Sequence, residues 1–197
     1  MNDEKVGHQR KSIRLSGYDY SLAGGYFVTI VTKGRVSLFG NVKNGEMIPN
    51  DQGVIARNEW FKTAQLRQHL TINDDEFVVM PNHIHGIIWT KDDHVRAQRR
   101  CALTPNNRFL VGSQTLGSIV RAHKSAVTYN IHKQTRMRDI PVWQRNYYEH
   151  IIRDERDYEN IFEYIQSNPL NWEKDEEYKT YKGGLFLIEC YCAATAQ

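Results

Sequence analysis

Residues 77–90 read FVVMPNHIHGIIWT, and this stretch decides the fold. Two runs rich in β-branched and apolar residues are separated by Pro81-Asn82, a pair typical of turns. The pattern therefore predicts two consecutive strands, at 76–80 and 83–90. Alternation along the second strand directs His83 and His85 to one face of the sheet and Ile84 to the other. Two imidazoles are thus expected side by side.

The rest of the chain supplies further strands and helices for the same sheet. Strands are expected at 26–32 and, as a small hairpin with Asn44-Gly45 at its turn, at 36–39 and 46–48. Helices are expected at 51–68, with Asp51 as N-cap, from Ser113 or Thr115 to Gln134, and after Arg153. A short extended piece at 141–143 precedes the last helix. This order predicts an α+β, ferredoxin-like fold, an antiparallel sheet with helices packed mainly on one face.

The length and composition predict one domain. With 197 residues, 40% hydrophobic and 25% charged, we expect a single domain over 1–174, including a basic arm at 1–23 and a mobile loop at 92–112. The tail at 175–197 has no assigned role. A net charge of +3 permits a nucleic-acid partner without requiring one. Three cysteines without disulfide-rich spacing, no export signal and no membrane-length apolar run predict a cytoplasmic protein that does not contact membranes.

The two histidines offer a metal site that needs more ligands than these two. Neutral imidazoles bind divalent metals, but an isolated His-x-His pair is more often a pair of surface or hydrogen-bonded histidines. On the last helix, an apolar stripe is expected to face the sheet, with Tyr164 and Asn168 neighbouring each other on its flank. Taken alone, Tyr164 is better explained as a core or boundary aromatic residue, and Asn168 could simply end the helix before Pro169.

A tyrosine close to such a metal site is a potential nucleophile. Its phenol has an ordinary pKa of about 10, so ionisation at pH 7 costs about 4 kcal/mol. A divalent ion that binds the same phosphate offsets this cost by stabilising the transition state. Imidazoles with an amide carbonyl favour Mn²⁺ or Mg²⁺.

Three segments together resemble the REP-associated tyrosine transposases of the single-tyrosine HUH superfamily. These are residues 77–86, the segment VWQRNYYEHIIR at 142–153, and Tyr164-Ile165 followed by Asn168-Pro169. Residues 25–32 and 116–125 are also similar, and the resemblance spans roughly residues 12–173. It implies a ferredoxin-like HUH domain that cuts and rejoins single-stranded DNA next to REP hairpins, with a divalent metal and a 5′-phosphotyrosine intermediate.

The resemblance also implies roles for individual residues. His83 and His85 match the metal ligands, Tyr164 matches the nucleophile, and Asn168 matches a further ligand position. Tyr148 and His150 are possible alternatives or helpers. The tail after about residue 172 matches nothing in the family.

Basic residues suggest contacts to DNA phosphates, although ordinary solvated surface charge explains most of them individually as well. The candidates are Arg10, Lys11, Arg14, Arg121, Lys124, Arg145 and Arg153. Two other functions stay open: a domesticated hairpin-binding protein that does not cleave DNA, and a His-x-His metallohydrolase that uses activated water. The sequence is compatible with a monomer or a homodimer.

Overall fold

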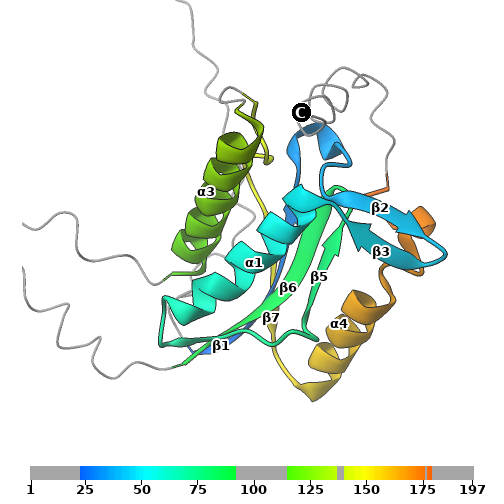
Figure 1. Cartoon of the computed structure of the whole chain (residues 1–197). Coiled ribbons are helices and arrows are strands. Elements are labelled where there is room, and N and C mark those ends of the chain that lie inside the picture. The colour runs from blue at the N-terminus through cyan, green and yellow to red at the C-terminus, as the bar shows by residue number, and fades with distance from the viewer. Residues whose placement is uncertain (1–22, 92–114, 137–139, 176, 179–197) are drawn as a thin grey trace, which may run out of the picture.

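A central antiparallel sheet organises the computed structural model, which describes residues 23–91, 115–136, 140–175 and 177–178 (Figure 1). Strands follow the order β4-β6-β1-β7, and β5 also pairs with β6. Their bounds are Gly24–Val31 for β1, Leu70–Thr71 for β4, Phe77–Met80 for β5, His83–Thr90 for β6 and Tyr148–Ile152 for β7. The two strands predicted from residues 77–90 are confirmed.

The β5-β6 hairpin and its long pairing with β1 set the register of the sheet. Met80 lies opposite His83 across the turn, and β6 pairs with all eight residues of β1, from Gly24 opposite Thr90 to Val31 opposite His83. Gly86 is required at its position because a Cβ there would lie 2.5 Å from the Trp60 ring. The register therefore fixes which side chains share each face.

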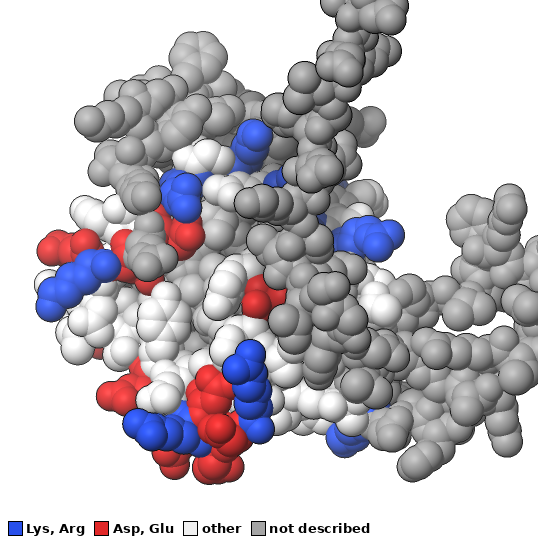
Figure 2. Space-filling view, turned by 180° about the vertical axis from the view of Figure 1, so that it is seen from behind, with Lys and Arg blue, Asp and Glu red and all other residues white. Residues whose placement is uncertain are grey.

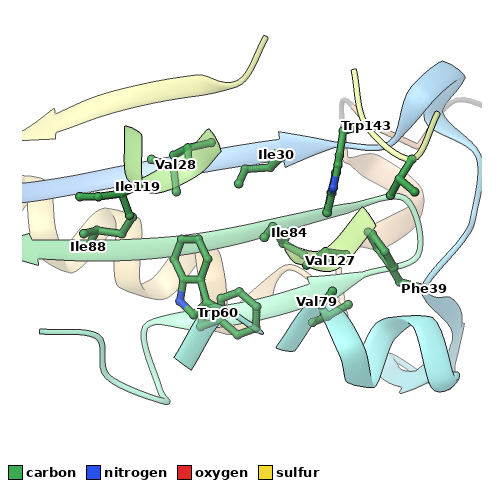
Figure 3. Packing of buried hydrophobic residues seen from close by; sticks show 14 of the residues in the cluster. Val28, Ile30, Phe39, Trp60, Val79, Ile84, Ile88, Ile119, Val127 and Trp143 are labelled. Carbon is green, nitrogen blue, oxygen red and sulfur yellow. The ribbon is translucent and has the colours of Figure 1, made fainter. Parts of the chain in front are cut away.

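Helices α1 (Asp51–Gln65) and α3 (Leu116–Thr135) cover one face of the sheet (Figure 1). The core beneath them contains Trp60, Ile84, Ile88, Ile119 and Val127, all buried (Figure 3). Full burial of such a side chain contributes about 1.5–3 kcal/mol, so this layer provides most of the apolar stabilisation.

Helix α4 (Glu155–Ser167) covers the opposite face, where a smaller core joins Ile165 to Phe27 and Ile87. Tyr158 and Ile161 pack against this core, which confirms the predicted apolar stripe of the helix. The α+β prediction is confirmed, with two of the three described α-helices on one face and α4 on the other. The predicted functional residues of α4 lie on this second face.

Several predicted boundaries were wrong. The N-cap of α1 is Asn50, whose side chain accepts a hydrogen bond from the amide of Gly53 at 3.0 Å, and the helix ends at Gln65 rather than residue 68. The small hairpin is formed by β2 (Gly40–Lys43) and β3 (Glu46–Pro49), so its first strand begins later than expected. Its Asn44-Gly45 turn is confirmed, with both residues at positive φ.

Two strands were not predicted. The extended piece at 141–143 contributes only a bridge between Trp143 and Thr32, whereas β7 begins five residues later, and β4 is a two-residue strand. Thr115 is confirmed as the residue before α3. The predicted arm at 1–23 lies, except for residue 23, outside the described residues, as does the predicted loop at 92–112. Within the described ranges, no helix has the length and apolarity needed to cross a membrane.

Candidate metal and nucleophile site

His83 and His85 form the centre of the site on β6. Both side chains are buried and point to the face that α4 covers, with ring centroids 4.3 Å apart. Strand alternation places them there, because Ile84 between them faces the core under α1 and α3. The prediction that the two imidazoles share one face is confirmed.

A hydrogen bond to Asn82 sets the tautomer of His83. The Asn82 Nδ2 amide donates to the carbonyls of Arg35 (3.2 Å) and Glu177 (2.8 Å), which leaves its Oδ1 facing His83 Nδ1 at 2.8 Å. Because Oδ1 can only accept, the proton of His83 is on Nδ1. His83 Nε2 is then a lone-pair nitrogen, and it is buried without a hydrogen-bond partner among the described residues.

Thr29 contacts the Nδ1 atom of His85, as Asn82 contacts the Nδ1 atom of His83. Its Oγ1 lies 2.8 Å from His85 Nδ1, and Thr29 is the residue of β1 directly opposite His85. Contacts of this kind hold the orientation of a metal-binding imidazole. His85 Nε2 faces away from β1, toward α4.

Burial keeps both rings neutral at pH 7. It lowers the pKa of His83 to about 4, an effect that the Asp175 carboxylate partly offsets and Arg35 slightly increases. Burial, together with neighbouring His83, lowers the pKa of His85 well below its ordinary value. Neutral imidazoles are the form that binds metal ions, so the pair is ready for ligation without losing protons.

Tyr164 brings a phenol to this pair. Its oxygen lies 3.3 Å from His85 Nε2, and its hydroxyl donates to Asp175 Oδ2 at 3.0 Å. The side chain is 43% exposed, so the hydroxyl is held at the rim of the site and is accessible from solvent. Asn168, one turn later on α4, donates from Nδ2 to the same Asp175 oxygen at 2.7 Å, while its buried Oδ1 has no hydrogen-bond partner among the described residues.

Asp175 is a potential metal ligand that the sequence analysis missed. One ligand atom from each of His83, His85 and Asp175 can be chosen so that all three lie within 4.8 Å of one another. The segment that carries Asp175 is held in place by Glu177. The Glu177 carboxylate pairs with Arg35 at 2.5 Å, and its backbone carbonyl accepts a hydrogen bond from Asn82. The tail, for which we predicted no role, therefore begins inside the site. Thr29 and Asn82 were also missed, although the pairing of a threonine with His85 follows once the β1-β6 register is known.

A buried carboxylate anchors α4 to the sheet. Glu76 accepts hydrogen bonds from the Tyr158 hydroxyl (3.0 Å) and the Trp89 indole (2.7 Å). Burial and this carboxylate raise the pKa of Tyr158 to about 12. Tyr158 is therefore a neutral donor at pH 7, and it fixes the helix that carries Tyr164.

The other predicted helpers lie outside this cluster. His150 Nε2 contacts both Asp157 oxygens, at 3.0 and 2.9 Å, in the first turn of α4, roughly two turns before Tyr164. Tyr148 is exposed on β7. Neither residue has a contact with His83, His85 or Asp175 among the contacts described.

The basic residues predicted to contact DNA differ in their exposure and in where they lie relative to the site. Lys124 donates to the carbonyl of Gln144 at 2.5 Å, and burial lowers its pKa to about 8, whereas Arg121 is exposed on α3, across the sheet from the site. Arg145 and Arg153 are exposed before and after β7. On the molecular face in Figure 2, basic side chains are interspersed with acidic ones. Arg10, Lys11 and Arg14 lie outside the described residues.

Comparison with known proteins gives two sequence relatives from Haemophilus influenzae. An uncharacterized protein is 44% identical over 176 residues, covering 87% of this chain and 94% of its own length. A second protein, provisionally named a REP-associated tyrosine transposase, is 26% identical over 160 residues, covering 79% of this chain and 77% of its own. No protein-family model matches the sequence.

Among solved structures, a REP-associated tyrosine transposase bound to a REP hairpin has a TM-score of 0.51 and 23% identity, covering 80% of this chain and 74% of that one. This likeness establishes the fold, that of the HUH transposases. The named relative and this solved structure agree with the sequence motifs: the chain is similar to the REP-associated tyrosine transposases.

Proposed function

We propose that the protein is a metal-dependent endonuclease and strand transferase that acts on single-stranded DNA next to hairpins. The observation that carries this proposal is the position of the Tyr164 hydroxyl, 3.3 Å from His85 Nε2 and 3.0 Å from Asp175. A solvent-accessible phenol in contact with two members of a potential metal site has the geometry of a nucleophile beside an electrophilic centre.

The donor set fits a divalent metal. His83 Nε2 and Asn168 Oδ1 are buried acceptors without partners among the described residues, which is unfavourable unless something binds them. With His85 Nε2 and the Asp175 carboxylate they would supply nitrogen and oxygen ligands, suited to Mn²⁺ or Mg²⁺. Bound there, the ion would withdraw charge from the scissile phosphate. Assignment of Asn168 as a ligand follows the family resemblance, and Asp175 is added by the geometry.

The chain's own residues account for the covalent step. Tyr164 transfers its proton to Asp175 Oδ2, the acceptor of its present hydrogen bond, as its oxygen attacks phosphorus. The new Tyr164 O–P bond replaces the bond to the 3′ oxygen, which takes the proton from Asp175 and leaves as a 3′-hydroxyl. Reversal with another 3′-hydroxyl rejoins DNA and regenerates the phenol, so no external energy source is needed.

The proposal is tested with labelled single-stranded DNA that carries a hairpin and its flanking sequence. With Mn²⁺, the wild type should form a protein-DNA adduct on a denaturing gel, and Tyr164→Phe should abolish the adduct and the cleavage. Cleavage that persists in Tyr164→Phe would instead indicate a hydrolase that uses water. Binding without cleavage by the wild type would indicate a domesticated hairpin-binding protein.

A further inference from the structure

Phe27 connects the site to the edge of the sheet through a row of aromatic rings. Its buried ring stacks on His85 with a centroid distance of 5.4 Å and meets Tyr164 edge-on at 6.1 Å. On its other side it meets Tyr148 edge-on at 6.4 Å. The proposed nucleophile and Tyr148 are therefore the two outer members of a row built on Phe27.

The strand register places Tyr148 on the same face as the site. Thr29 of β1 lies opposite His85 on one side and opposite Tyr148 on the other, so the three side chains form a row across three strands. β7 is the last strand of the sheet in this direction. Unlike Phe27, which is buried, Tyr148 is 56% exposed.

The Tyr148 hydroxyl is unlike that of Tyr164. It has no hydrogen-bond partner among the described residues, whereas the Tyr164 hydroxyl contacts both His85 and Asp175. Tyr148 is an aromatic residue that is more than half exposed on the edge strand of the sheet. Exposed arginines, Arg145 and Arg153, precede and follow the strand. Exposed rings interspersed with cations are the combination that binds single-stranded nucleic acid.

We propose that Tyr148 is a stacking platform for a base of the single-stranded DNA next to the phosphate attacked by Tyr164. This inference rests on the proposed function, since it names how the same site holds its substrate. The ring of Tyr148, and not its hydroxyl, contacts the DNA base. Tyr148 is therefore a substrate-positioning residue and not a second nucleophile.

The experiment measures binding of fluorescent hairpin-flanked single-stranded DNA by anisotropy in EDTA, which separates binding from cleavage. Tyr148→Ala should weaken binding by about 5- to 150-fold, the effect of losing one base-aromatic stack. Tyr148→Phe, which keeps the ring, should bind within about twofold of the wild type. Tyr129→Ala is the matched control, because Tyr129 is a 65% exposed tyrosine on α3, on the other face of the sheet, and should leave binding unchanged.

An abasic scan of the DNA, measured with the wild type and with Tyr148→Ala, identifies the stacked base. One abasic position beside the cleaved phosphate should reproduce the loss seen with Tyr148→Ala, and the two changes combined should cost no more than either alone. Equal binding by Tyr148→Ala and the wild type, or equal losses in Tyr148→Phe and Tyr148→Ala, would overturn the inference.

Adduct formation with Mn²⁺ separates this inference from the proposed function. If the wild type binds with the expected Tyr148 dependence but forms no adduct, stacking stands and the strand-transferase proposal fails. If the wild type forms the adduct and Tyr148→Ala binds equally well, only the stacking inference fails. A wild type that does not bind single-stranded DNA overturns both.

Discussion

Acid should destabilise the protein through His123, a histidine buried in the core between the rings of Trp60 and Trp143. Burial lowers its pKa from 6.5 to about 4, an effect that Lys124 increases and the Glu59 carbonyl partly offsets. At pH 7 the imidazole is neutral in both the folded and the unfolded chain. As the pH falls through 6.5, only the unfolded chain takes up the proton, so stability is lost between pH 6.5 and 4.

The size of this loss follows from the two pKa values. Between pH 7 and pH 5, proton uptake by the unfolded chain alone lowers the free energy of unfolding by about 2 kcal/mol for pKa values of 6.5 and about 4. His123→Phe removes the titrating group and roughly conserves volume. The variant should therefore lose about 2 kcal/mol less than the wild type over this range, whatever its stability at pH 7.

Urea unfolding followed by circular dichroism, at pH 7 and pH 5 in EDTA, measures this difference. His83 and His85 titrate in both proteins and cancel in the comparison. Equal losses of stability in the wild type and His123→Phe would refute the reasoning, because they would mean that His123 takes up its proton without unfolding.

Three further predictions test the site, the sheet and the DNA contacts. Thr29→Val removes the partner of His85 Nδ1 and should weaken Mn²⁺ binding by about 10- to 100-fold in calorimetric titrations; unchanged affinity would contradict the orienting role of Thr29. Gly86→Ala places a Cβ 2.5 Å from the Trp60 ring and should cost about 1–3 kcal/mol, with a denaturation midpoint equal to wild type as the contrary result. If five phosphates are contacted, log affinity for single-stranded DNA should fall with log salt concentration at a slope of about −3.5. Arg145→Gln should make this slope shallower by about 0.7. An unchanged slope would mean that Arg145 does not contact a DNA phosphate.

The sequence was sufficient to predict those parts of the site that depend on local periodicity. Alternation along residues 83–90 places both histidines on one face, and the helical repeat places Tyr164 and Asn168 on one flank of α4. Both patterns act within a few residues, so tertiary context had little opportunity to override them. That the helix packs on the same sheet face as the histidines is a tertiary fact, which only the structure establishes.

Two of the missed features, Asp175 and β7, depend on contacts between distant segments. Asp175 reaches the histidines because the chain turns back after α4 and Glu177 is fixed by Arg35, which lies 142 residues earlier. β7 owes its strand conformation to pairing with β1, because its sequence has no strong alternation of apolar and polar residues. The choice of Asn50 over Asp51 as N-cap was a one-residue difference between two equally good capping residues.

The central claim is that the Tyr164 oxygen becomes bonded to DNA phosphorus. After reaction with hairpin-flanked single-stranded DNA and Mn²⁺, nuclease and trypsin digestion followed by fragmentation mass spectrometry identifies the modified tyrosine directly. The account predicts a nucleotide on the tryptic peptide of residues 157–174, with fragment ions that assign it to Tyr164 and not to Tyr158. A nucleotide on Tyr148, or cleaved DNA with no modified tyrosine, would contradict it.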